Sequence, residues 1–284
     1  MEVWYINNKS LNLKNDVVFK ELFSKKGNEI FLQDFLSGLL NIDIQRIEIQ
    51  KDSSLSKNVV SEKYGILDIK ATLNDNTTVD IEMQVTDYGN MIERALYYSS
   101  KLISSQLKSG NDYIQLKPVI VICILNFDIF PFEEYITETV TVSKKHLDYE
   151  IIKHQRFYFI ELSKFRNNNY DLKEKTNQWL TFIDGMNKKG VEFAMSKNNV
   201  IKKAKEELDY LTGNERLQRL AELREKALKD RNSLYNYGHR TGVDEGMKKE
   251  KIDIAKTMIK EKFDINIISK ITGLTTEEIE AIKD

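Results

Sequence analysis

The sequence has very little cysteine and proline, with one cysteine and two prolines among its 284 residues. A lone cysteine excludes an intrachain disulfide framework, and with it the class of small disulfide-stapled secreted domains. Cys123 lies within the apolar run Val119–Leu125, so we interpret it as a buried strand residue. So little proline, with 31% charged residues spread along the chain, argues against long disordered linkers.

The sequence also lacks a long uncharged apolar segment and a basic segment followed by an apolar one. These absences predict no membrane span and no secretion signal, so we expect a cytoplasmic protein that does not contact a membrane. Its net charge is only −1, from 43 Lys and Arg against 44 Asp and Glu. A balance this close to zero neither indicates nor excludes a polyanionic partner, because local patches matter more than totals.

The apolar periodicity predicts an α/β domain followed by helices. Two helices are expected within 15–40, broken near Gly27, with Asn15 or Asp16 as the cap of the first. The segments expected to follow are strands at 44–49, 64–73 and 78–85, a helix at 90–107 and a strand at 118–126. In that helix the positions expected to face inward are Ile92, Leu96, Leu102, Ile103 and Leu107.

The last part of the sequence changes character near residues 164–170. Edge strands are expected at 136–142 and 156–162, and from Leu172 onward the pattern is almost wholly helical. We therefore expect a domain at 1–165 and a helical region at 166–284. Between Lys188 and Lys256, 17 basic and 12 acidic residues interleave, which favours a solvated helical surface over a nucleic-acid groove.

The segments 64–73 and 78–85 form the most informative pattern in the sequence. Both alternate apolar and polar residues, and Asn74-Asp75-Asn76 between them is typical of a turn. A hairpin with its apolar residues on one face pairs residues whose numbers sum to 150. This register sets Ile69 opposite Ile81 and Lys70 opposite Asp80.

The same register places Asp68 directly opposite Glu82, with β-carbons about 4.5 to 5.5 Å apart. Two facing carboxylates repel one another, and a divalent cation is a partner that suits two hard oxygen donors. Gln84 shares their face and offers an amide to a water molecule or a phosphate oxygen. The plainer alternative is a solvated outer face on which these three residues have no chemical role.

Four blocks in order resemble a known family. They are Asn15-Asp-Val-Val-Phe-Lys-Glu-Leu-Phe23, Leu67-Asp-Ile69, Ile81-Glu-Met-Gln84 and Glu93-Arg-Ala-Leu-Tyr-Tyr98. They resemble the Rpn family of recombination-promoting nucleases and transposases, within the PD-(D/E)xK nuclease superfamily. The resemblance implies a restriction-endonuclease-like α/β core, ordered helix, three strands, helix, strand, with a C-terminal helical region.

The resemblance also implies a site and an activity. Asp68 and Glu82 would bind Mg²⁺, with Mn²⁺ as an alternative, and Gln84 would stand where most of the superfamily has lysine. Arg94 is a candidate to replace that lysine's charge, or else an anchor for its helix. Asp16 is a further acidic candidate, although capping the first helix explains it slightly better.

The implied function is a metal-dependent DNA endonuclease associated with recombination or mobile elements. The alternative, motivated by the missing lysine, is a catalytically inactive DNA- or protein-binding module. A transposase that joins strands is a third hypothesis, and the choice between DNA and RNA stays open.

The tail predicts a helix at 252–263 and then a helix-turn-helix-like pair, with Thr275 and Glu278 as a capping box. Because Glu277, Glu278 and Glu280 would repel phosphates, we favour packing or homo-oligomerisation through the C-terminal helices over DNA binding by this pair.

Overall fold

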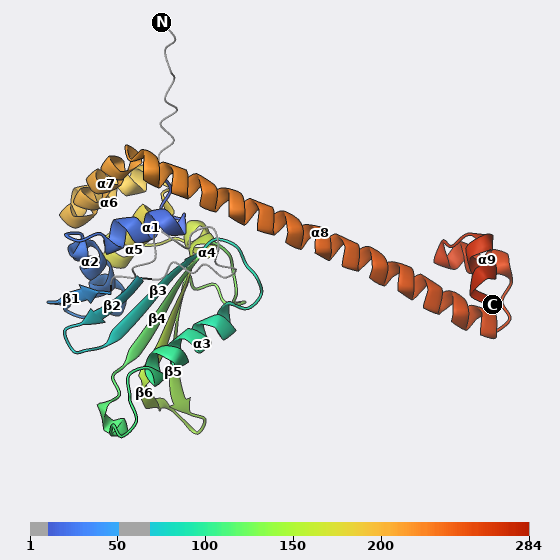
Figure 1. Ribbon diagram of the computed structural model, residues 1–284, viewed down its shortest axis with the longest axis horizontal. Coiled ribbons are helices and arrows are strands. Elements are labelled where there is room, and N and C mark those ends of the chain that lie inside the picture. The colour runs from blue at the N-terminus through green and yellow to red at the C-terminus, as the bar shows by residue number, and fades with distance from the viewer. Residues whose placement is uncertain (1–10, 51–68, 284) are drawn as a thin grey trace, which may run out of the picture. The chain divides into compact units, whose positions relative to one another are not determined.

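The computed structural model describes residues 11–50 and 69–283, which fall into two compact units (Figure 1). The first unit ends at Lys226 and the second begins at Ala227. The boundary expected near residue 165 falls inside the first unit, because helices after that point pack on the N-terminal helices. Thus α5 (Lys175–Asp184) and α7 (Asn199–Thr212) both contact α2 (Glu29–Leu40).

A six-stranded mixed sheet forms the centre of the first unit, in the order β1-β2-β3-β4-β6-β5. Its strands are β1 (Ile47–Ile49), β2 (Ile69–Leu73), β3 (Thr78–Gln84), β4 (Val119–Leu125), β5 (Ile136–Ser143) and β6 (His146–Glu161). β3, β4 and β6 are parallel neighbours, while the other pairs are antiparallel. Helix α3 (Met91–Ser104) connects β3 to β4. The predicted order of helix, three strands, helix and strand is confirmed.

The two late strands differ in position from one another. β5 lies at the sheet edge, as expected, but β6 lies between β4 and β5. The expectation of an edge strand at 156–162 is therefore wrong. The physical reason is that the end of β6 carries Phe159 and Ile160, both buried, which suits an inner strand.

The N-terminal helices are α1 (Asp16–Ser24) and α2, and between them Gly27 has a φ of 97°, which only glycine adopts easily. The side chain of Asn15 accepts a hydrogen bond from the Val17 amide and caps α1. Of the two expected caps, Asn15 is therefore confirmed, and Asp16 is instead the first residue inside the helix.

Two apolar layers cover the two faces of the sheet, with α1 and α2 on one side and α3 on the other (Figure 1). On the α3 side the helix presents Met91, Ala95 and Ser99, all buried. Ile92 and Leu96, expected to face inward, are 49% and 51% exposed. The small side chains of Ala95 and Ser99 face the sheet instead, so the start of the predicted stripe is wrong by one position. Leu102 and Ile103 pack on this side of the sheet, as expected.

The β2–β3 hairpin has the predicted register. Ile69 pairs with Ile81 and Lys70 pairs with Asp80, and Asn76 in the turn has a φ of 64°. The expected pair of Asp68 with Glu82 lies outside the described residues, since the description resumes at Ile69.

A 3₁₀ turn, η1 (Tyr113–Gln115), precedes β4. The remaining helices follow the sheet and are α4 (Leu162–Asn167), α6 (Lys188–Lys197), α8 (Glu215–Lys260), α9 (Ile265–Thr272) and α10 (Thr276–Lys283). In the second unit, Ala255 on α8 packs with Ile268, Leu274 and Ile279 around α9 and α10. Between α9 and α10, Gly273 adopts a φ of 70°. Within residues 11–50 and 69–283, no helix has the length and apolarity that a membrane crossing needs.

The capping box at the start of α10 is confirmed. The Thr275 amide donates to Glu278 Oε2 at 2.9 Å, and the Glu278 amide donates to Thr275 Oγ1 at 3.2 Å. Each side chain therefore satisfies one of the helix's otherwise unpaired amides.

Candidate active site

Strand β3 holds the candidate residues because its alternate side chains point to the α3 face of the sheet. Asp80, Glu82 and Gln84 lie in register with Val121, Cys123 and Leu125 of β4. Asp80 is fully buried and Glu82 is 2% exposed, whereas Gln84 at the strand end is half-buried. A solvated outer face is therefore not what the structure shows at Glu82.

Arg94, in the first turn of α3, contacts two of the predicted site residues. Its guanidinium lies 3.3 Å from Glu82 Oε2 and donates to Gln84 Oε1 at 3.4 Å. The other end of the Gln84 amide donates to the Thr86 carbonyl at 2.8 Å. The structure thus brings Glu82, Gln84 and Arg94 together where β3 ends and α3 begins.

Cys123 reports the electrostatics of this layer. Burial raises the pKa of its thiol well above the ordinary value, and the nearby carboxylates of Glu82 and Asp80 raise that pKa further. Arg94 acts in the opposite direction. Burial and the two carboxylates therefore both keep the thiol in its neutral form.

Asp16 is held differently from the β3 residues. Its Oδ2 accepts from Arg224 Nε at 2.7 Å, and a terminal nitrogen of Arg224 lies 2.5 Å from the same oxygen. Asn15 also donates its side-chain amide to the Ala221 carbonyl, so the start of α1 is fastened to the start of α8. The other oxygen of Asp16, Oδ1, accepts from the Val17 amide at 3.0 Å.

The described residues alone do not provide a complete set of ligands for a metal ion. In residues 11–50 and 69–283, no three His, Cys, Asp or Glu side chains are grouped to hold a metal ion. Asp68, the expected second carboxylate, is not among those residues. The donor chemistry nevertheless fits, because the carboxylate of Glu82 is a hard oxygen ligand on the strand that pairs with β2.

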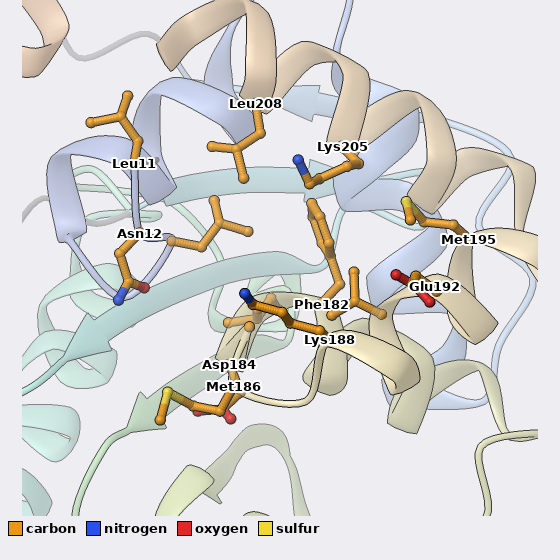
Figure 2. A pocket seen from close by; sticks show the side chains of 14 residues that line it. Leu11, Asn12, Phe182, Asp184, Met186, Lys188, Glu192, Met195, Lys205 and Leu208 are labelled. Carbon is orange, nitrogen blue, oxygen red and sulfur yellow. The ribbon is translucent and has the colours of Figure 1, made fainter. Parts of the chain in front are cut away.

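A separate pocket of about 450 Å³ lies beside the start of the described chain (Figure 2). Apolar side chains such as Leu11, Phe182 and Leu208 line most of it. Its buried Asp184 is bound by Lys14 at 3.1 Å and by Arg166 at 2.7 Å. None of the predicted site residues that the structure describes lines this pocket, so it is not the candidate active site.

Comparison with family models assigns the chain to a family. Residues 13–238 match the family model described as PD-(D/E)XK nuclease family transposase. The chain belongs to this family. Residues 248–284 match a second model, described as the C-terminal HTH domain of the Rpn/YhgA-like nuclease family. No curated protein and no solved structure gives a match.

Membership of the PD-(D/E)XK family confirms the resemblance seen in the four sequence blocks and the α/β fold. A family of nuclease-type transposases acts on nucleic acid, typically with divalent metals. The HTH model covers α9 and α10, the pair identified as helix-turn-helix-like from the sequence.

The sequence argument does not reach two features of the structure. It sets Asp80 opposite Lys70, and the structure shows that Asp80 is fully buried beneath α3. Alternation does place Asp80 on the face of Glu82, but it cannot tell that a helix covers this face. Arg224 lies 208 positions from Asp16, so no local pattern signalled their contact.

Proposed function

We propose that this PD-(D/E)XK protein is a divalent-metal-dependent endonuclease that hydrolyses phosphodiester bonds in DNA. The observation that carries the proposal is the buried Glu82 carboxylate beside Gln84 and Arg94. Buried charge is costly without compensation, and side chains clustered in this way are typical of functional sites. The hairpin register, extended by one pair beyond Ile69 and Ile81, would add Asp68 opposite Glu82.

In this proposal Asp68 and Glu82 would hold Mg²⁺ or Mn²⁺ beside the scissile phosphate. When bound, such a cation supplies an activated water and positive charge beside the phosphate. Attack by water would form a bond from its oxygen to phosphorus and break the bond to the leaving oxygen, with the water's proton released to solvent and the leaving oxygen protonated by solvent. Gln84, neutral and held by Thr86, orients the reacting groups but does not accept a proton.

Cleavage of supercoiled plasmid tests the proposal. Wild type, Asp68→Ala and Glu82→Gln are each incubated with Mg²⁺, with Mn²⁺ and with chelator. Metal-dependent nicking is expected for the wild type and is expected to fall at least about 100-fold in both variants, as loss of a catalytic group usually does. Glu48→Gln is the matched control, because Glu48 is an exposed β1 carboxylate that should leave nicking unchanged.

A catalytically inactive binding module is the second candidate, favoured by Gln84 in place of the usual lysine. This alternative predicts DNA binding without cleavage by well-folded wild type in every metal condition. It also predicts that Asp68→Ala and Glu82→Gln bind DNA as the wild type does. Plasmid that is nicked but never joined to another DNA would separate the nuclease from a strand-joining transposase.

The C-terminal unit supports a proposal of its own, that the chain self-associates through its last helices. Ile267 and Ile271 lie one turn apart on α9 and are 47% and 61% exposed. Glu277 and Glu278 begin α10 and disfavour close contact with phosphates. Light scattering of the full chain should show a mass above the monomer that Ile267→Glu with Ile271→Glu lowers; an unchanged mass would refute this proposal.

A further inference from the structure

The guanidinium of Arg94 stands beside the position where most of the superfamily has a lysine ammonium. Gln84, which occupies that position, is neutral and brings no charge of its own. Yet its Oε1 accepts a hydrogen bond from Arg94, while its Nε2 donates to the Thr86 carbonyl. The reverse orientation of the amide would set two donors against each other, so these partners fix which end faces the arginine.

The contact between Arg94 and Glu82 is loose for a charged pair. Its 3.3 Å separation exceeds the roughly 2.7 to 2.9 Å of a strong charge-assisted hydrogen bond. Glu82 is 2% exposed and the Arg94 side chain 20% exposed, so the pair is shielded but not sealed from solvent. A divalent ion that binds the Glu82 carboxylate therefore has to displace only a weak contact with Arg94.

Arg94 is also incompletely satisfied within the described part of the chain. Its Nε is buried and has no hydrogen-bond partner there. An unused buried donor is costly, so a side chain selected only to anchor α3 should not leave one. The Arg94 Nε–H therefore remains available as a hydrogen-bond donor at the edge of the candidate site.

We propose that Arg94 supplies the site's positive charge in place of the usual lysine. Gln84 holds the Arg94 guanidinium by a hydrogen bond, and Arg94 gives up its contact with Glu82 when a metal ion binds that carboxylate. This inference rests on the proposed nuclease function. It assigns two effects to one residue: Arg94 opposes metal binding at Glu82, and it supports the reaction once the metal is bound. An arginine that only anchors α3 would have neither effect.

A set of variants separates these roles. Arg94→Ala is expected to bind Mn²⁺ at least as tightly as wild type, because the cation that contacts Glu82 Oε2 is gone. Its kcat for plasmid nicking should fall about 100-fold, the usual result of removing one charge-stabilising group. Adding Gln84→Lys to Arg94→Ala restores a cation at the motif position and should recover at least tenfold of that loss.

Two further variants keep the test informative. Arg94→Lys retains the charge and should keep a measurable part of the activity even if Arg94→Ala folds poorly. Arg156→Ala is the matched control, because Arg156 pairs with Glu138 and Glu150 in the sheet and should change neither Mn²⁺ affinity nor kcat.

Several outcomes would overturn the inference. These are Arg94→Ala with wild-type kcat, a folded double variant no better than Arg94→Ala, or weaker Mn²⁺ binding by folded Arg94→Ala. If wild type binds Mn²⁺ but never cleaves, the nuclease proposal fails separately. The Mn²⁺ affinities of wild type and Arg94→Ala then decide whether Arg94 competes for Glu82. If wild type binds no Mn²⁺, both the nuclease proposal and the inference about Arg94 are refuted.

Discussion

The ion pair between Asp16 and Arg224 offers a measurable test of how the first unit is held together. Both side chains are about nine-tenths buried, and two nitrogens of Arg224 lie 2.7 and 2.5 Å from one oxygen of Asp16. Removing one partner of such a pair leaves the other charge buried, which costs about 3–5 kcal/mol. Domains of this kind are stable by only about 5–15 kcal/mol, so the loss is a large fraction of the whole.

Arg224→Met and Asp16→Asn make the change with little alteration in volume. Each should lower the free energy of unfolding by about 3–5 kcal/mol. The combination of Arg224→Met with Asp16→Leu should recover most of that loss, since it leaves no buried charge behind. Urea unfolding followed by tryptophan fluorescence measures this, because Trp179 is fully buried in the first unit.

Arg219→Met on the same helix is the control. Arg219 pairs with Glu222 at 3.7 Å, with both side chains 71% exposed, so its loss should cost under about 1 kcal/mol. The reasoning fails if Asp16→Asn is as mild as this control. If Asp16→Asn were mild and also abolished nicking, Asp16 would belong to the metal site and not to the fastening of α8.

Three further predictions concern single residues. Cys123 should resist thiol reagents in the native protein and react only on unfolding, because burial raises the pKa of its thiol; rapid native labelling would contradict this. Since that pKa is raised on folding, its share of the stability is present below the unfolded thiol's pKa of about 8.5 and is lost as pH rises above it. Gly273→Ala should destabilise the second unit by about 1 kcal/mol because of its φ of 70°, measured by thermal unfolding followed by circular dichroism. Thr275→Ala should cost about 1 kcal/mol in the same measurement through loss of the capping box, and an unchanged midpoint would refute it.

The hairpin shows how far sequence alone can lead. Alternation and the turn residues determined the β2–β3 register, because a slip by one residue would turn the whole apolar set away from the core. The same alternation placed Glu82 and Gln84 on one face. It could not show that α3 buries this face, because burial depends on how the helix between β3 and β4 packs on the sheet.

Helix α3 illustrates the opposite limit. Its helical pattern was clear, yet the inward stripe was placed on Ile92 and Leu96 because they are the more apolar side chains. The helix instead sets Ala95 and Ser99 against the sheet, where Arg94 in the same turn can contact Glu82. Periodicity ranks positions by how apolar their side chains are, so it does not predict that small side chains face the sheet.

The long-range contacts explain why the nuclease unit continues well past residue 165. Asp34 on α2 accepts hydrogen bonds from Trp179 at 2.8 Å and from Asn198 at 2.7 Å. Asp16 depends in the same way on Arg224. A chain ending at 165 would leave both carboxylates without these partners and would uncover the apolar side of α2. The family model, which extends to residue 238, accordingly includes the turns of α8 that hold α1 in place. The helices between the sheet and Lys226 therefore belong to the first compact unit and hold α1 and α2 in place.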